Sequence, residues 1–361
     1  MKPDSPNKPG DQENVEPAIT PLGTPPAPPI RPRTGDIIHT TSELAVGEGD
    51  VRSAELGEVV RGTSLWRDAW RRLLKNKLAV LGLAFVFLIT IAAVIGPAVI
   101  RRVNGITPDY IPSDAALIKS FPPFRAPDGS FSATHPMGTD NQGRDLLART
   151  LQGGQISLMV GIIATLMSLI IGVSYGAIAG YLGGRTDSIM MRLVDVLYSL
   201  PYIIIVIVLL SMFKKQTAQG QLILLFVALG SVSWLTMARI VRGQVLSLKN
   251  QEFVLAARAT GVSTTRIIFR HIVPNTLGPV IVYATLTIPA VMLSEAFLSF
   301  LGFGVQAPLA SWGTLAADGS QTIGIYPWQL IGPGLAMGLT LFSLNFVGDG
   351  LRDAFDPQMR K

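Results

Sequence analysis

The chain has 361 residues, of which 48% are hydrophobic and only 15% are charged, and its mean hydropathy is +0.42. This composition is too apolar for a soluble domain of this length and favours a membrane protein. The absence of cysteine excludes disulfides, thiolate metal sites and thiol nucleophiles. Basic residues that flank membrane segments account for the net charge of +6, so we expect no nucleic-acid partner.

The N-terminal part of the chain divides into two segments. Residues 1–60 hold ten of the 25 prolines and lack helical or strand periodicity, which predicts a disordered cytoplasmic tail. A signal peptide is not expected, because no apolar core of about 7 to 15 residues lies near Met1. Residues 61–77 place Trp66 and Trp70 opposite Arg67 and Arg71, and this pattern predicts an amphipathic helix at the membrane interface.

Six stretches are long enough to cross a bilayer, which needs roughly 20 apolar residues. The first is 78–100; the proline-rich region 101–150 that follows must lie outside the membrane, and we expect it to be extracytoplasmic. Residues 151–348 form a core of five further spans, and 349–361 form a polar tail. These five spans are expected within Thr150–Gly184, Leu193–Phe213 with Pro201 inside it, Gln221–Met237, Thr276–Leu298 and Trp328–Val347. The distribution of Lys and Arg places both termini in the cytoplasm.

Glycine recurs every four residues within the second span. The positions are Gly172, Gly176, Gly180 and Gly184, and this spacing keeps them near one face of a helix. Small residues at such positions let the backbone of another helix approach closely in lipid. We therefore expect these four glycines to form a helix-packing surface.

The stretch 250–275, NQEFVLAARATGVSTTRIIFRHIVPN, is the longest polar interval between apolar runs in the second half of the chain. It predicts two short helices that meet at Gly261, where a left-handed residue ends the first helix. Ser263 is expected to cap the second helix, which is expected to stop at Pro274. The charge distribution places this loop in the cytoplasm.

Chemical motifs are scarce along the chain. The three histidines are far apart in sequence, and no phosphate-binding loop of the G-x-x-x-x-G-K-[ST] type occurs. We expect neither an enzyme nor a cofactor site. Few charges lie inside the spans, which argues against a proton- or ion-coupled carrier.

Four charged residues are candidates for contacts at the outer face: Asp140, Arg144, Asp145 and Glu295. The segment GTDNQGRD that contains the first three is equally typical of a turn that caps the next helix, so both interpretations stay open. Glu295 lies about 28 Å of helix beyond Thr276, which places it near the outer interface.

The loop LAARATGVSTTRIIFRHIVPN resembles the EAA loop of ABC importer permeases. Ala256, Ala257, Gly261, Ile272 and Pro274 match that pattern, and Arg258 lies within it. Leu255 stands where the family often has Glu, and Val273 stands where it often has Leu. The loss of the acid at Leu255 removes a possible ion pair with an ATPase but leaves the helix and turn intact.

Further segments resemble the C-type permease of dipeptide and oligopeptide ABC importers, and together they cover about residues 64–360. They include HPMGTDNQGRDLLARTLQGGQISLMVG, MMRLVDVLYSLP, LSEAFLSFLGFGVQAPLASWG and FVGDGLRDAFDPQMR. The resemblance implies an all-α membrane protein with six spans, whose loop 250–275 is a helix-turn-helix that docks on the ATPases.

The same resemblance implies partners in a bacterial cytoplasmic membrane: a second permease, two ATPase subunits that bind ATP and Mg²⁺, and an extracytoplasmic peptide-binding protein or lipoprotein. Two alternatives stay open. One keeps this architecture but imports nickel or another small solute, and the other is a channel or secondary transporter that needs no ATPase.

Overall fold

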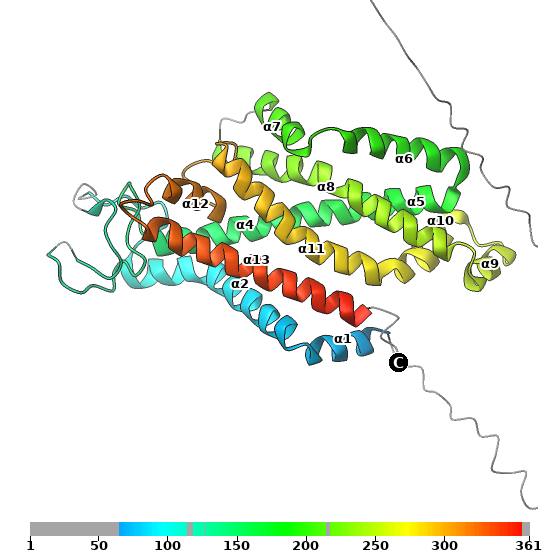
Figure 1. Ribbon diagram of the computed structural model, residues 1–361, viewed down its shortest axis with the longest axis horizontal. Helices are drawn as coiled ribbons and strands as arrows, with labels where there is room; N and C mark the ends of the chain where they lie inside the picture. The colour runs from blue at the N-terminus through cyan, green and yellow to red at the C-terminus, as the bar shows by residue number, and fades with distance from the viewer. Residues whose placement is uncertain (1–64, 114–117, 127, 214–216, 356–361) are drawn as a thin grey trace, which may run out of the picture. The chain divides into compact units, whose positions relative to one another are not determined.

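The computed structural model describes residues 65–113, 118–126, 128–213 and 217–355 (Figure 1). The tail expected at 1–60 and the last residues of the expected C-terminal tail lie outside these ranges. Every named element of the described chain is a helix, and the only strand-like pairings in it are two isolated bridges, Arg125 with Phe131 and Thr139 with Asp145.

The helices follow one another as α1 (Leu65–Lys75), α2 (Lys77–Asn104), α4 (Leu146–Ser168), the π-helix η1 (Leu169–Val173), α5 (Ser174–Leu182), α6 (Gly184–Ser199), α7 (Tyr202–Met212), α8 (Ala218–Leu248), α9 (Glu252–Ala259), α10 (Thr264–Arg266), the π-helix η2 (Ile267–Ile272), α11 (Val273–Phe300), α12 (Trp312–Ser320) and α13 (Trp328–Phe355). Because η1 and η2 join their neighbours without a break, α4 to α5 and α10 to α11 are two continuous helices.

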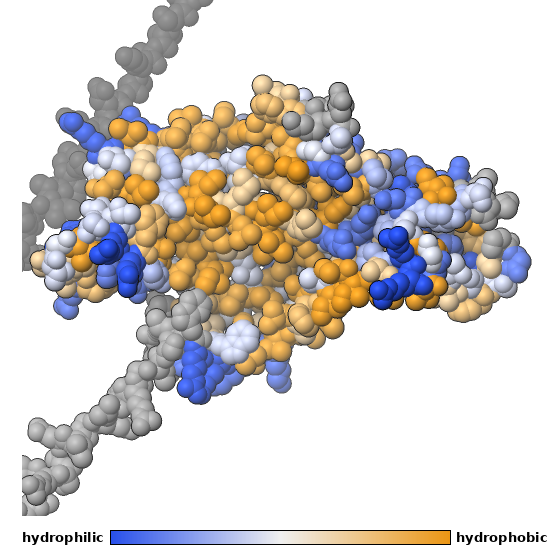
Figure 2. All heavy atoms as spheres, turned by 180° about the vertical axis from the view of Figure 1, so that it is seen from behind, coloured by the Kyte–Doolittle hydropathy of each residue, from blue (hydrophilic) through white to orange (hydrophobic). Residues whose placement is uncertain are grey.

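Five helices of the described chain are long and apolar enough to cross a membrane: Lys77–Asn104, Leu146–Leu182, Ala218–Leu248, Thr264–Phe300 and Trp328–Phe355. Figure 1 shows them running side by side, and Figure 2 shows apolar side chains over the middle of the bundle with polar side chains toward its ends. The chain is therefore an all-helical, multi-pass membrane protein.

The expected third span, Leu193–Phe213, is not one helix. It consists of α6 and α7, which meet at an angle of 83° and give a sixth crossing only if the bent pair counts as one span. The break lies at Pro201, which has no N–H to donate, and Leu200 before it is extended, with φ −82° and ψ 139°. The sequence predicted an interruption at Pro201, but it did not predict the angle of 83° between the two helices.

Two helix ends also differ from expectation. The fourth span was expected within Gln221–Met237, yet α8 continues to Leu248, and two arginines beyond Met237 are paired with acids of α6. Arg239 Nη2 donates to Asp195 at 2.7 Å, and Arg242 donates to both carboxylate oxygens of Asp187 at 2.6 and 2.7 Å. Such charge-assisted pairs compensate the two cations inside an otherwise apolar helix.

The second end that differs is at Pro274, where the helix was expected to stop. The chain instead stays helical through this proline, which occupies the first turn of α11 directly after the π-helix η2. The π-helix η2 directly before Pro274 departs from the regular i→i−4 hydrogen-bond pattern, and such an irregular turn can accommodate a residue that has no N–H to donate.

Three of the four periodic glycines face α8. A Cβ at Gly172 would lie 2.8 Å from the carbonyl oxygen of Trp234, one at Gly176 would press on the carbonyl of Ala238, and one at Gly180 would lie 3.0 Å from the carbonyl oxygen of Arg242. Gly184 does not share this role: it starts α6 with φ +56°, and nothing lies near its Cβ position. The expectation of four packing glycines is therefore wrong at Gly184, because the helix ends at Leu182 and the chain turns there.

Candidate functional site: the 250–275 loop

The turn at the centre of the loop depends on Gly261. Helix α9 ends with Thr260 donating its N–H to the carbonyl of Ala256 at 3.1 Å, and Gly261 then adopts φ +75°. Its N–H reaches the carbonyl of Arg258 at 3.0 Å, so the helix end keeps its hydrogen bonds through the reversal. Ser263 precedes α10 with extended backbone, but its side chain makes no capping hydrogen bond.

One side of the loop is packed into the bundle. Val254, Ala257, Ile267, Ile268 and Ile272 are buried in one cluster with residues of α5, α8 and α11. Ala257 is only 8% exposed and Ile272 is fully buried, so these two predicted docking residues belong to the attachment of the loop to its own chain. Their apolar side chains make the loop a fixed part of the bundle.

The other side of the loop is exposed. Leu255 is 48% exposed, and Ala256, Arg258, Gly261 and Pro274 are exposed as well. Between Ser263 and Pro274, the exposed ring of Phe269 and its basic neighbours line a shallow hollow. An exposed surface that combines small apolar, aromatic and basic residues is typical of a protein docking site.

Two side chains tie the loop to the end of α5. Arg258 Nε donates to the hydroxyl oxygen of Tyr181 at 3.0 Å, and its guanidinium lies 4.9 Å from the centre of that ring. Lys249 Nζ donates to the carbonyl of Gly180 at 3.2 Å. The sequence did not indicate the roles of Tyr181 and Lys249, because the paired residues are 77 and 69 positions apart.

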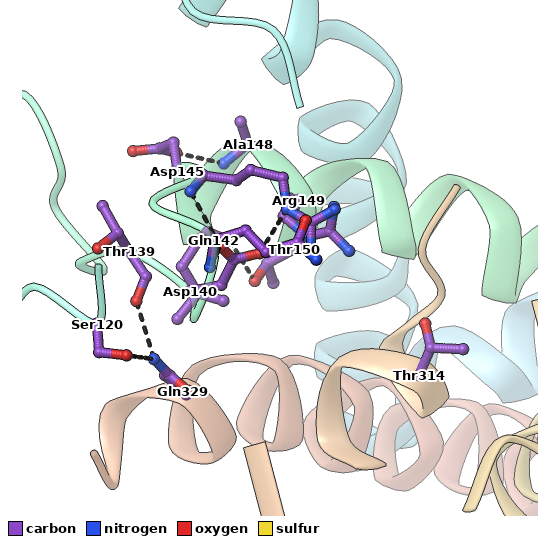
Figure 3. A network of polar contacts seen from close by, with 12 residues as sticks. Ser120, Thr139, Asp140, Gln142, Asp145, Ala148, Arg149, Thr150, Thr314 and Gln329 are labelled. Carbon is purple, nitrogen blue, oxygen red and sulfur yellow. Dashed lines mark hydrogen bonds and ion pairs between the residues drawn. The ribbon is translucent and has the colours of Figure 1, made fainter. Parts of the chain in front are cut away.

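At the opposite end of the bundle, the segment before α4 is held by its own aspartates (Figure 3). Asp145 caps α4 by accepting from the N–H of Ala148 at 2.6 Å, and its other oxygen contacts His135 Nδ1 at 2.8 Å. Asp140 accepts from Gln142 N–H at 2.8 Å and pairs with Arg144 Nε at 2.7 Å. Of the two interpretations of GTDNQGRD, the geometry therefore supports the turn and cap.

Burial agrees with this interpretation. Asp145 is 2% exposed and Arg144 is 9% exposed, so neither side chain is free to contact a partner in this conformation. Gln329 of α13 extends the network by donating to Ser120 Oγ and to the carbonyl of Thr139, both at 3.1 Å (Figure 3). Hydrogen bonds from Gln329 thus connect the segment before α4 to α13.

Asp318 of α12 lies beside the same network. Burial raises the pKa of this carboxyl group, and the nearby guanidinium groups of Arg149 and Arg144 oppose the rise. The Asp318 carboxyl group therefore interacts electrostatically with Arg149, Arg144 and Asp140 at this end of the bundle.

Glu295 is not an outer-face contact, because it is only 1% exposed. Its Oε1 accepts from Ser299 Oγ at 2.8 Å and from Ser311 Oγ at 2.7 Å, and Ser311 caps α12. The next residue, Trp312, donates from its backbone to Ser157 Oγ and from its indole to the carbonyl of Thr150. Glu295 therefore helps to fix α12 between α11 and α4.

A groove of about 480 Å³ lies among α6, α7, α8 and α11, at the break between α6 and α7. Its walls combine aliphatic side chains with the neutral hydroxyl-bearing side chains of Tyr198, Tyr202, Ser233, Thr236, Tyr283, Thr287 and Ser294. No acidic or basic side chain lines it. The sequence did not predict this groove, because its residues come from three separated stretches, 197–202, 232–236 and 283–294.

No group of three or more His, Asp or Glu side chains in the described residues could hold a metal ion, and the chain has no cysteine. The described part of the molecule thus offers two features for function, the exposed face of the loop and the groove.

Family models and curated relatives that match this chain are membrane components of transport systems, and together they cover most of its length. Residues 172–361 match the family of binding-protein-dependent transport system inner membrane components, and residues 64–116 match the N-terminal transmembrane domain of oligopeptide transport permease C. The chain is 48% identical to the oligopeptide transport system permease protein OppC of Escherichia coli K12 over 83% of this chain and 94% of that protein. It is 46% identical to the dipeptide transport system permease protein DppC of Bacillus subtilis over 82% of this chain and 87% of that protein. A solved structure of the MetNI methionine ABC transporter aligns with 58% of this chain and 96% of its own, at 17% identity and a TM-score of 0.45.

Proposed function

The chain belongs to the family of binding-protein-dependent transport system inner membrane components, and we propose that it is a membrane subunit of an ATP-driven importer of dipeptides or oligopeptides. The observation that carries the substrate class is the similarity to peptide permeases, for example 48% identity over 301 residues to OppC of Escherichia coli K12. The chain itself does not hydrolyse ATP in this proposal, and separate ATPase subunits supply the energy.

The loop 250–275 is the proposed contact with the ATPases. Its buried side is part of the bundle, so a force on its exposed side acts directly on α5, α8 and α11. Leu255 and Ala256 offer apolar contact on the exposed side, and Arg258 fastens α9 to α5. This arrangement supports the transmission of ATPase closure to the spans as a rigid movement.

A second, similar permease is the proposed partner within the membrane. Helices α6 and α7 expose large apolar side chains, among them Ile189, Leu193, Val196, Ile204 and Met212. The groove at their junction opens beside this apolar surface, and we propose that it forms part of the wall of the peptide path. A neutral lining suits peptides of varied side-chain charge, because it binds none of them strongly.

The proposed topology places both termini and the loop in the cytoplasm of a bacterium, because basic residues are concentrated on that side. The opposite end, with α12 and the segment before α4, then faces an extracytoplasmic peptide-binding protein. The geometry of Asp140, Arg144 and Asp145 supports a structural role there, so their backbone and neighbours would form the contact surface.

The test is uptake by liposomes that contain the chain, a second permease and the ATPases, with a peptide-binding protein added outside. We expect uptake of a labelled oligopeptide that requires ATP and survives collapse of the proton gradient. Uptake that follows the gradient without ATP would support a secondary transporter. Uptake of nickel with no uptake of peptide would support the small-solute alternative.

A variant of the loop gives the matching test of coupling. Gly261→Val forces a branched side chain into φ +75°, which should distort the turn. We expect normal assembly of the complex with strongly reduced uptake. Wild-type uptake by this variant would contradict the proposed role of the turn.

A further inference from the structure

Helix α1 is fixed against the bundle along one face. Ala69 and Leu73 are 6% and 4% exposed, and they pack with Ala79 of α2 and Ala354 of α13. Gly350 of α13 permits this contact, because a Cβ there would lie 3.0 Å from a methyl group of Leu73. Packing therefore fixes the rotation of α1 about its own axis, and this rotation determines which of its side chains point away from the bundle.

A second face of α1 is apolar but uncovered. Trp70 is 55% exposed and Leu74 is 51% exposed. With 3.6 residues per turn, these two side chains lie one above the other between the packed face and the side of the helix that carries Arg67 and Arg71. Around the circumference of α1, the face packed against the protein is followed by an exposed apolar stripe and then by a basic stripe.

The basic stripe is unpaired within the described chain. Arg67, Arg71, Lys75 and Lys77 are exposed, and none of these side chains makes an ion pair or a hydrogen bond there. The segment 65–77 carries five basic residues and one acidic residue. Its excess positive charge is therefore available to an anionic surface.

The position of α1 relative to the bilayer follows from its short connection to α2. Only Asn76 separates the two helices, and its side chain caps α2 by accepting from the N–H of Ala79 at 3.2 Å. Only 17% of the residues in the most apolar stretch of α2 are buried, so this span lies at the edge of the bundle and is exposed to lipid. Because α1 directly precedes a lipid-facing span, it lies where the hydrocarbon gives way to headgroups.

We propose that α1, together with Lys77, is a binding surface for anionic phospholipids. Trp70 and Leu74 enter the upper acyl region, and Arg67, Arg71, Lys75 and Lys77 bind headgroup phosphates. Each basic residue near an anionic membrane surface strengthens the interaction about fivefold at moderate ionic strength. The inference concerns lipid binding by this chain alone and does not depend on the transported substrate.

The experiment uses the purified full-length chain in phosphatidylcholine nanodiscs. The preference for spin-labelled phosphatidylglycerol over spin-labelled phosphatidylcholine is measured for the wild type and for three variants. The first carries Arg67→Gln, Arg71→Gln, Lys75→Gln and Lys77→Gln. The second exchanges the same positions between Arg and Lys, which keeps the charge. The third carries Arg101→Gln and Arg102→Gln, two exposed basic residues at the other end of α2.

We expect the preference for phosphatidylglycerol to fall at least fivefold in the first variant and to persist in the other two, and we expect added salt to weaken it in the wild type. An undiminished preference in the first variant would overturn the proposal, as would an equal loss in the third. Loss in the charge-conserving variant as well would show that structure, not charge, had been disturbed, and would also overturn it. Absence of any preference in the wild type would also overturn the proposal.

Discussion

Replacement of Gly176 by alanine tests whether close contact between α5 and α8 holds the bundle together. The new Cβ would press on the carbonyl of Ala238 and would lie 3.0 Å from Val241 Cβ, whereas ordinary contacts are 3.4–4 Å. The two helices must therefore part by several tenths of an ångström. Each van der Waals contact between two heavy atoms contributes about 0.1–0.2 kcal/mol, and a gap of about 0.5 Å removes roughly a quarter of that attraction. For an interface of about 50 such atom pairs, the free energy of unfolding therefore falls by about 1–3 kcal/mol.

The assay is reversible unfolding in mixed micelles, followed by circular dichroism. Gly243→Ala is the matched control, because Gly243 lies in α8 with nothing near its Cβ position and helix propensity favours alanine there by up to about 1 kcal/mol. We expect Gly176→Ala to be less stable than the wild type and Gly243→Ala to be equal or more stable. Equal stability of Gly176→Ala and the control would refute the argument from close packing.

Three further predictions concern side chains at the two ends of the bundle. Leu255→Asp should reduce uptake per ATP hydrolysed several-fold more than Leu255→Met, because an apolar contact cannot accommodate a carboxylate; equal activity in transport assays would count against apolar docking. Arg258→Ala removes one hydrogen bond and one cation–π contact to Tyr181, and we expect hydrogen exchange in α9 to rise roughly fivefold with little change in global stability. Glu295→Ala leaves two buried serine hydroxyls without their acceptor and should destabilise the fold by about 2–4 kcal/mol, whereas Glu295→Gln keeps an acceptor and should cost about 1 kcal/mol; a smaller loss in the alanine variant would argue against the tie to α12.

Local chemistry explains what the sequence could predict. The turn at Gly261 follows from the conformational freedom of glycine, and the interruption at Pro201 follows from the missing N–H. Long apolar runs located the spans, because a bilayer requires about 20 such residues. Each of these features depends on a few neighbouring residues, so no knowledge of tertiary contacts was needed.

Tertiary contacts explain what the sequence could not predict. In α8 beyond Met237, Arg239 and Arg242 pair with acids that lie 44 and 55 positions earlier. The burial of Ala257 and the exposure of Ala256 depend on which side of α9 meets α8 and α11. Glu295 was a candidate for contacts at the outer face, but it is buried and accepts hydrogen bonds from Ser299 and Ser311 inside the protein.

The most direct test of the account is the contact between the loop and an ATPase. The chain has no cysteine, so Ala256→Cys introduces a single thiol on the exposed side of α9, and Ala257→Cys places the control thiol on the buried side, where alanine is 8% exposed. A short photoreactive maleimide is attached to each variant before the transporter is assembled, and cross-links are compared per attached probe. We expect a cross-link to the ATPase from position 256 and little or none from position 257. No cross-link from position 256, or equal cross-linking from both positions, would contradict the account.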